Sequence, residues 1–253
     1  MELVKTAIKV GNSAGVLLPR EWLNSQVRVV LQPLNIERDI LEILAEERIL
    51  ENSRGVYIIG SYARNEQNID SDVDVLAITS SINKRIKRGK YEVICVPKDE
   101  VEMQLRNNAL PILAMIKEAK AVINEELIKK YSGTKLNRQN IKWHIETTKT
   151  AMKVAKKGIE ISRELGRGVG DGIAYSLILR LRTLYIIRCI RKNKMWSKRE
   201  FLRLVKKVGG SALAYERYLS SKNKNTLSEK LPAEEAEKIM DYINKGTKEL
   251  ENG

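Results

Sequence analysis

Three short apolar segments between residues 55 and 97 constrain the fold of this chain more than any other feature. They read GVYIIG (55–60), VDVLAIT (73–79) and YEVICVP (91–97). Runs of this length that are rich in Val and Ile are typical of buried strands. A helix is expected before them, from Asn35 to about Leu50, and the residues after them predict a helix in NALPILAMIKEA and an edge strand in AVIN. This order predicts an α/β domain over residues 35–132, with a small mixed sheet and flanking helices.

Polar residues of a particular kind stand where these strands begin and end. Gly60 and Ser61 close the first strand, and Asp72 and Asp74 open the second on one face. A glycine lets the backbone approach a ligand closely, and a hydroxyl beside free N–H groups can hold phosphate oxygens. Paired carboxylates suit Mg²⁺, which prefers oxygen ligands and substrate phosphates. If Glu92 on the third strand lies beside the aspartates, the three carboxylates form the layout of a two-metal phosphoryl or nucleotidyl transfer site.

Each of these signals has a simpler interpretation when it is taken alone. A DxD pair is common in surface turns rich in Asp and Ser, such as NIDSDVD, and Glu92 could be a solubility charge on an edge strand. The combination, with Gly-Ser placed ten residues before the first aspartate, favours a phosphate and metal site.

The stretch GSYARNEQNIDSDVDVLAIT resembles the nucleotidyltransferase superfamily of DNA polymerase beta, which has a G-S-x10-D-x-D signature, and is most similar to its minimal nucleotidyltransferases. The resemblance spans roughly residues 36–130. It implies that Gly60 and Ser61 hold a nucleoside triphosphate, ATP being the expected donor, and that Asp72 and Asp74 bind two Mg²⁺ ions. It also implies that Glu92 is the third metal ligand and a possible base for the acceptor hydroxyl.

Three positions need comment against the family pattern. Arg64 matches a common family position and is expected either to contact phosphate or to brace the loop. Asn65 replaces the usual Gly. Glu92 is one methylene longer than the usual Asp, which affects the base role more than the metal sites.

Residues 1–34 are expected to form a separate β segment. Strands are predicted in LVKTAIKV and VRVVLQ, with the turn GNSAG and the apolar run VLLP between them. About thirty residues of strand cannot enclose a core alone, so this segment is expected to pair with a second copy. Residues 5–32 resemble the AbrB/MazE-type swapped-hairpin domain, which implies a homodimer and possible DNA binding. Lys9 and Arg20 are then candidate phosphate contacts, although dimerisation is favoured because the segment is not net basic.

Residues 133–253 are expected to form an α-helical bundle. Helices are predicted over 137–165, about 172–192 with Asp171 as its cap, about 198–208, and after Pro232. The net charge of +14 is concentrated here, because residues 138–207 contain 19 Lys and Arg against 5 Asp and Glu. This concentration favours an anionic partner such as RNA, DNA or a phosphorylated small molecule, although a lysine-rich helical surface, as in heat-stable proteins, is the alternative.

Two helices of this bundle carry the side chains that are predicted to bind the acceptor. Arg188 lies close to the apolar side of its helix, so it either pairs with a buried acid or lines the catalytic cleft as a contact for phosphate. The candidate acceptor-binding residues are Arg180, Arg188, Arg191, Lys149 and Lys153.

Other classes of protein are disfavoured by simple features. No apolar run reaches the roughly 20 residues that cross a bilayer, and Met1 is followed by Glu2 without a secretion signal, so a cytoplasmic protein is expected. Cys95 and Cys189 are expected to be buried free thiols. His144 is the only histidine, so a zinc site of the usual kind is not expected.

Two hypotheses about function remain from the sequence. The first is an Mg²⁺-dependent enzyme that transfers NMP from an NTP, with ATP or CTP expected, to a hydroxyl on RNA, protein or a small molecule. The second is a DNA-binding, antitoxin-type regulator whose transferase domain modifies a partner toxin or acts as a sensor.

Overall fold

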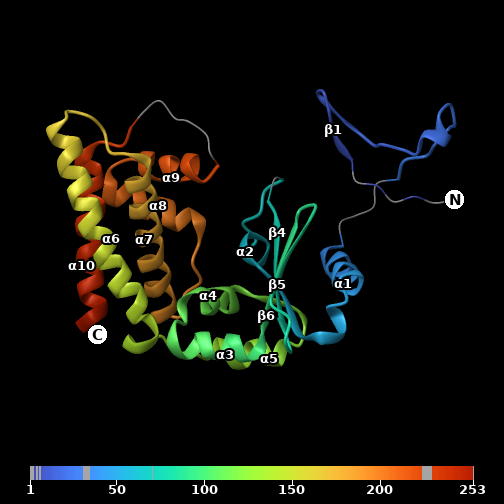
Figure 1. Ribbon diagram of the computed structural model, residues 1–253, viewed down its shortest axis with the longest axis horizontal. Coiled ribbons are helices and arrows are strands. Elements are labelled where there is room, and N and C mark those ends of the chain that lie inside the picture. The colour runs from blue at the N-terminus through green and yellow to red at the C-terminus, as the bar shows by residue number, and fades with distance from the viewer. Residues whose placement is uncertain are drawn as a thin grey trace. The chain divides into compact units, whose positions relative to one another are not determined.

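The computed structural model describes two compact units, Met1–Ile36 and Glu37–Gly253. The residues whose structure is described are 3, 5, 7–30, 35–69, 71–223 and 230–252. The ribbon in Figure 1 follows the chain through both units, and each unit is described separately here.

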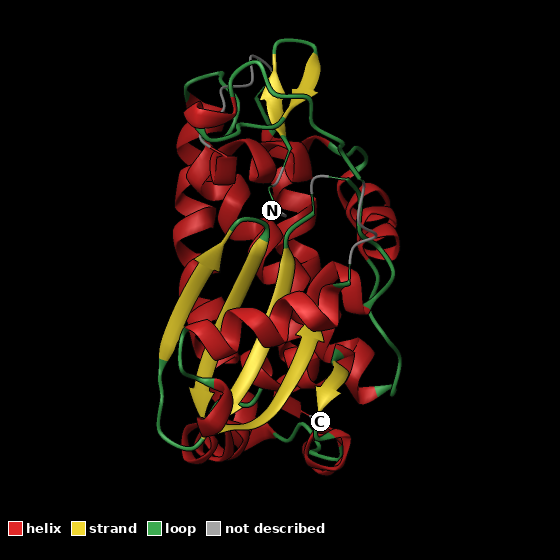
Figure 2. Ribbon diagram, turned by 90° about the vertical axis from the view of Figure 1, so that its right-hand side faces the viewer, coloured by secondary structure: helices red, strands yellow, loops and turns green. Residues whose placement is uncertain are grey.

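A five-stranded mixed sheet forms the centre of the N-terminal part of the second unit (Figure 2). Its strand order is β5-β6-β4-β3-β7. Strand β4 runs parallel to β6, and every other neighbouring pair in this sheet is antiparallel. The strands are β3 (Ser53–Ile59), β4 (Val73–Thr79), β5 (Lys84–Arg88), β6 (Tyr91–Pro97) and β7 (Lys120–Ile123). The predicted mixed sheet is therefore confirmed, and β5 is a strand that the sequence did not indicate.

Side-chain alternation gives the sheet two buried faces. Tyr57, Leu76 and Ile78 belong to a hydrophobic cluster with helices α3 (Lys98–Asn107), α4 (Leu110–Glu118) and α5 (Glu125–Ser132). The opposite face is covered by α1 (Ile36–Glu46), which lies on the far side of the sheet from the C-terminal helices (Figure 1). Helix α1 is shorter than predicted, because Leu50–Asn52 forms a separate 3₁₀ turn before β3.

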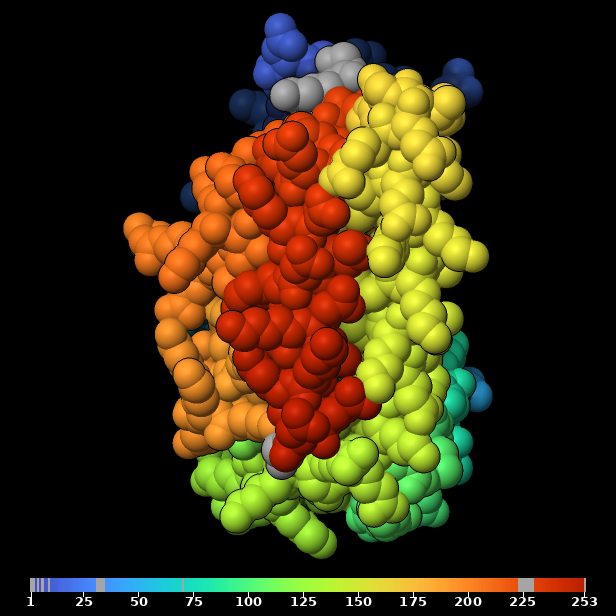
Figure 3. Space-filling view, turned by 90° about the vertical axis from the view of Figure 1, so that its left-hand side faces the viewer, coloured from blue at the N-terminus to red at the C-terminus, as the bar shows by residue number. Residues whose placement is uncertain are grey.

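The C-terminal part of the second unit is helical, as predicted. It contains α6 (Arg138–Glu164), α7 (Asp171–Arg191), α8 (Lys198–Gly209), α9 (Leu213–Asn223) and α10 (Ala233–Asn252). Figure 3 shows α10, in red, lying between α6, in yellow and green, and the helices drawn in orange. Ile141, Ile145 and Leu250 of these helices join the cluster that covers the sheet, so one hydrophobic cluster spans the sheet and the adjoining helices, while a second cluster lies within the helical part itself.

The N-terminal caps determine where helices α6 and α7 begin. Asn137 caps α6 in a capping box with Asn140, as its position before the helix suggests. Asp171 was predicted to cap α7 but is its first helical residue, because Gly170 occupies the cap position and Asp171 pairs with Arg217 of α9. Helix α9 was not predicted.

The first unit contains much less regular structure than the sequence suggested. Strands β1 (Ile8–Val10) and β2 (Ser13–Gly15) pair as an antiparallel hairpin, and Arg20–Trp22 forms a 3₁₀ turn. Residues 27–30 of the predicted strand VRVVLQ are not in a strand, and its last two residues lie outside the described residues. The predicted apolar run VLLP is likewise not a strand. These apolar side chains lack a partner strand within the described part of this unit.

The helices and the two cysteines bear on two expectations from the sequence, the lack of a membrane-spanning run and the state of the thiols. Across the described part of the chain, every helix is too short or too polar to span a membrane. Cys95 and Cys189 are buried free thiols, as predicted.

Candidate active site

The pairing of β4 with β6 brings two of the predicted carboxylates together. Asp74 and Glu92 are direct partners in this parallel pair, so their side chains lie on the same face of the sheet. That face also carries Leu76 and is turned toward α4 and the C-terminal helices. Asp72 is exposed and stands one residue before β4 begins.

The electrostatic surroundings of Asp74 disfavour its charged form. Burial raises the pKa of Asp74, and the negative charges of Glu92, Asp72 and Glu118 raise it further. Arg64 acts in the opposite direction with a smaller effect. A carboxylate whose charged form is destabilised by neighbouring acids suits the binding of a cation.

Gly60 occupies the turn between β3 and the short helix α2 (Gly60–Ala63), and its backbone touches Asp74. Its φ angle is +71°, which L-residues other than glycine rarely adopt. A Cβ atom at this position would lie 2.3 Å from Asp74 Oδ2. The glycine therefore allows the chain to turn directly against the carboxylate, and Ser61 follows as the second residue of α2.

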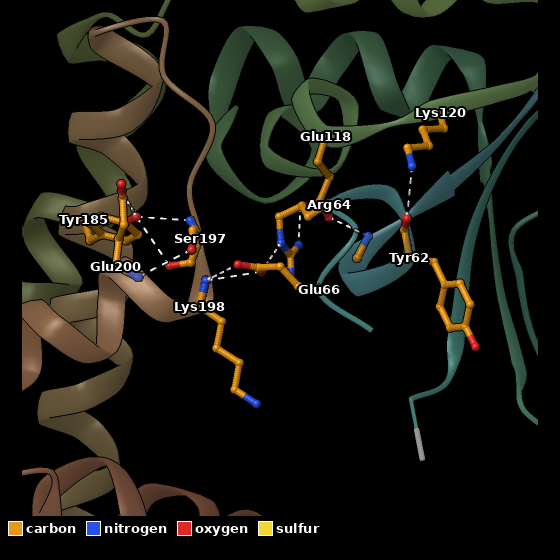
Figure 4. A network of polar contacts seen from close by, with 10 residues as sticks. Tyr62, Arg64, Glu66, Glu118, Lys120, Tyr185, Ser197, Lys198 and Glu200 are labelled. Atoms are coloured by element: carbon orange, nitrogen blue, oxygen red, sulfur yellow. Dashed lines mark hydrogen bonds and ion pairs between the residues drawn. The ribbon is translucent and has the colours of Figure 1, made fainter. Parts of the chain in front are cut away.

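A chain of polar contacts starts at Gly60 and ends at helix α8 (Figure 4). The Gly60 N–H donates to Glu118 Oε1 over 2.7 Å, and the other oxygen of Glu118 pairs with Arg64. Arg64 Nε also donates to Glu66 Oε2 at 3.0 Å. Glu66 in turn accepts from the backbone N–H of Lys198 at 2.9 Å. The contacts of Arg64 are those of a residue that braces the loop, one of the two roles expected for it.

The backbone conformation of Asn65 explains why asparagine can stand where the family pattern has glycine. Its φ is +55°, in the left-handed region where glycine is commonest and asparagine is tolerated. Its side-chain oxygen accepts from Lys120 Nζ at 2.6 Å. Asparagine therefore supplies the turn that the usual glycine would make and also ties the loop to β7.

The fit of a metal ion can be judged from the oxygen donors. Within the described residues, no three acidic, cysteine or histidine side chains gather as a ready set of ligands. Glu92 pairs with Arg85 at 3.1 Å, and Asp72 is exposed. Mg²⁺ commonly takes one or two carboxylates and completes its shell with water and substrate phosphates. The negative charges of Glu92, Asp72 and Glu118 that act on Asp74, and the oxygen donors of these carboxylates, fit such an ion.

Three of the predicted acceptor-binding side chains make contacts within the helical bundle. Lys149 pairs with Glu251 of α10. Arg180 Nη1 donates to Thr147 of α6 at 3.1 Å, and its charge adds to the burial that lowers the pKa of His144 to about 4. Arg188 donates to Tyr242 and pairs with Glu249 at 2.7 Å, both on α10. These residues thus face α6 and α10.

Lys153 and Arg191 are exposed, and neither takes part in an ion pair within the described portions of the chain. The five predicted acceptor-binding residues are therefore spread over α6 and α7 and do not converge on one point.

Sequence reasoning missed Glu66, Glu118 and helix α8 as parts of this region. Glu118 is the last residue of α4, where a negative charge interacts unfavourably with the helix dipole. An acid at that position could have indicated that its carboxylate is compensated by a positively charged or hydrogen-bonding partner. Glu66 carries no such signal, because the helix that it contacts is 132 residues away in the sequence.

The family comparison identifies the domain that carries this site. Residues 37–131 match the family model of the nucleotidyltransferase domain. This part of the chain is therefore a nucleotidyltransferase domain, as the resemblance in the sequence predicted, and the protein is a transferase enzyme. A search of the curated proteins gives no match.

Two solved structures are similar to this chain at low identity. One is a nucleotidyltransferase-like protein from Exiguobacterium sibiricum 255-15, with 12% identity, a TM-score of 0.39, and coverage of 85% of this chain and 75% of that one. The other is the spectinomycin adenyltransferase AAD(9) from Enterococcus faecialis, solved with ATP and spectinomycin. It has 12% identity, a TM-score of 0.41, and coverage of 84% of this chain and 98% of that one.

The contact between Gly60 and Asp74 predicts a difference between two glycine substitutions. Gly60→Ala and Gly89→Ala both force alanine into a left-handed turn, which costs about 1–2 kcal/mol. Only the Gly60 variant also pushes a Cβ into Asp74, since Gly89 has open space around it. We expect Gly60→Ala to lower the urea midpoint further and to abolish nucleotidyl transfer, and Gly89→Ala to retain transfer. Equal transfer by the two variants would contradict the close packing of Gly60 on Asp74.

The raised pKa of Asp74 predicts that its charge destabilises the metal-free fold. The folded state holds the Asp74 proton more tightly than the unfolded chain does. Stability is therefore lost as pH rises from about 3.8 through the folded pKa, and the loss persists at neutral pH. With a chelator at neutral pH, Asp74→Asn is expected to raise the urea midpoint, while the exposed control Asp99→Asn leaves it unchanged.

Two further measurements belong to this experiment. The advantage of Asp74→Asn should shrink as the pH is lowered toward 3.8, and added Mg²⁺ should raise the midpoint of the wild type more than that of the variant. A lower midpoint for Asp74→Asn in chelator would show that the carboxylate is well compensated in the folded chain.

Proposed function

We propose that this enzyme catalyses Mg²⁺-dependent transfer of NMP from an NTP, with ATP as the expected donor, to a hydroxyl of an RNA acceptor. The observation that carries the proposal is the in-register pairing of Asp74 with Glu92 on one face, with the Gly60 backbone against Asp74. Oxygen ligands for a cation and a turn that approaches it closely are what transfer of a phosphoryl-type group requires.

Each site residue has a defined part in this proposal. Asp72, Asp74 and Glu92 hold Mg²⁺, and Ser61 orients the phosphates beside Gly60. When bound, Mg²⁺ lowers the pKa of the acceptor hydroxyl and neutralises charge on the phosphate oxygens. Arg64 and Glu118 hold the Gly60 turn in place through the contacts described above.

The proposed reaction is a single displacement at the α-phosphorus of the NTP. The acceptor oxygen forms a bond to the α-phosphorus while the bond from that phosphorus to the α–β bridging oxygen breaks. The electron pair of that bond leaves with pyrophosphate. The hydroxyl proton passes to the Glu92 carboxylate, which lies beside Asp74 on the neighbouring strand.

Substitution of Asp72 tests the proposed site directly. Asp72 is exposed and precedes β4, so Asp72→Asn should leave the fold intact while removing a metal ligand. With each labelled NTP, Mg²⁺ and total cellular RNA, we expect label in RNA and a loss of at least about a hundredfold in rate for this variant. Asp99→Asn, an exposed aspartate on α3, serves as the matched control. Wild-type incorporation by Asp72→Asn would refute the metal site, and label only in protein would move the acceptor to that class.

We also propose that residues 1–36 pair with a second copy of the chain. Many of their apolar side chains are exposed, among them Val29 at 76%, Leu17 at 70% and Leu23 at 69%. Burying such side chains against a partner contributes about 25 cal/mol for each Å² removed from water. Binding of DNA or of a toxin by this unit stays a prediction from the sequence.

Light scattering tests the proposed dimer. The full chain is expected to be a dimer, and the double variant Leu17→Ser, Val29→Ser is expected to be a monomer. A matched control, Val154→Ser with Ile161→Ser, removes two apolar side chains of α6 that are 65% and 54% exposed, and it should stay dimeric. A dimer that survives the N-terminal substitutions would place the interface elsewhere.

A further inference from the structure

Helix α8 carries four cationic side chains beside the active-site loop. Arg199, Arg203 and Lys206 follow the i, i+4, i+7 spacing of one helix face, with Lys198 at its start. All four are exposed. Together with Leu202 and Glu66 they line a hollow of about 420 Å³, a size that suits a nucleotide. We call these four residues the α8 cationic face.

The α8 cationic face differs from the row of cations along α6 because, in the described part of the chain, its four side chains take part in no ion pair. On α6, Lys142, Lys149, Lys156 and Arg163 each pair with a glutamate. Among the ion pairs of the described residues, none involves the side chains of the α8 cationic face. Glu200, the acid of this helix, pairs instead with Lys194. Positive charge without internal partners is available to an anionic ligand.

The α8 cationic face also begins at the catalytic site. The backbone N–H of Lys198 donates to Glu66, and Arg64 and Glu118 continue the contacts to Gly60 (Figure 4). Gly60 in turn lies against Asp74, on the sheet face that is turned toward the C-terminal helices. A ligand bound along α8 therefore lies beside Glu66, at the end of the loop that carries Gly60.

We propose that the α8 cationic face binds the phosphodiester backbone of a single-stranded RNA end and so presents its terminal ribose hydroxyl to the site. This proposal rests on the proposed function and names the surface that selects the acceptor. The nine residues of helix from Lys198 to Lys206 span about 12 Å from the first Cα to the last. Consecutive phosphates of one strand are about 3.4 Å apart along a helix axis, so the row matches about four of them. Leu202 supplies an apolar contact for a base or sugar between the cations.

Binding of a fluorescein-labelled oligouridylate to the full chain tests this surface, with anisotropy measured over a range of salt concentrations. The variant Arg199→Gln, Arg203→Gln, Lys206→Gln removes three of the cations. The control Lys149→Gln, Lys153→Gln, Lys156→Gln removes the same charge from α6 and includes two residues that the sequence suggested for acceptor binding.

The α8 variant is expected to bind more weakly and to lower the slope of log K against log salt by about 2, because each lost phosphate contact on a single strand contributes about 0.7. The α6 variant is expected to retain nearly the wild-type slope. Equal slopes for the wild type and the α8 variant, or a larger loss in the α6 variant, would overturn the proposal. Competition by polyglutamate as effective as that by unlabelled RNA would also overturn it, in favour of an acidic protein partner.

The outcome for RNA binding is separable from the outcome for catalysis. If the wild type binds RNA through α8 but incorporates no labelled NTP, the proposed function fails and the binding surface stands. If Asp72→Asn abolishes labelling while the α8 variant binds RNA and labels it as the wild type does, the transfer activity stands and the assignment of α8 is wrong.

Discussion

The geometry of the active site depends on one buried carboxylate, that of Glu118. It is 9% exposed, and both of its oxygens are used, one by the Gly60 N–H and one by Arg64. A buried charge is tolerated only when its hydrogen-bonding capacity is satisfied, so the two partners and the carboxylate stabilise one another. This contact fixes the turn at Gly60, and the turn lies against Asp74. Glu118 also adds to the negative charge that raises the pKa of Asp74.

The same contact links the sheet to the helical part of the protein. Arg64 lies between Glu118 and Glu66, and Glu66 accepts from the first N–H of α8. The hydrophobic cluster that includes Leu76, Ile141 and Leu250 holds the two parts together, but apolar packing alone does not set the orientation of the helices relative to the sheet. The polar contacts set that orientation, because hydrogen bonds to a carboxylate form only over a narrow range of distances and angles. Packing thus joins the helices to the sheet, and Glu66 aligns α8 with the site.

Much of this architecture could be predicted from local sequence patterns. The three apolar strands, the glycine that ends β3 and the carboxylates at Asp74 and Glu92 are all local signals, and the structure pairs the last two as expected. Strand β5 escaped prediction because KRIKR has a single apolar residue, Ile86, and its edge position lets the charged residues face water. The role of Arg64 could not be decided because Glu118, its buried partner, is 54 residues away.

The distribution of ion pairs shows why the net charge of a segment does not by itself identify a surface with unpaired positive charge. The basic segment 138–207 has a large net charge, but many of its cations on α6 and α7 meet glutamates, several of them on α10, outside that segment. Pairing of this kind leaves little field for a ligand, since an ion pair at a surface is largely neutral at a distance. The α8 cationic face takes part in no such ion pair within the described chain, and it lines a hollow beside Glu66, which is linked through Arg64 and Glu118 to the Gly60 turn. A triphosphate would be repelled by the acids around Asp74 unless a divalent cation lay between them, whereas an RNA backbone would be attracted to α8 without one. In the proposed reaction, the two sets of charge therefore separate the requirements of the donor from those of the acceptor: the carboxylates need a divalent cation to accept a triphosphate, and α8 attracts the anionic acceptor.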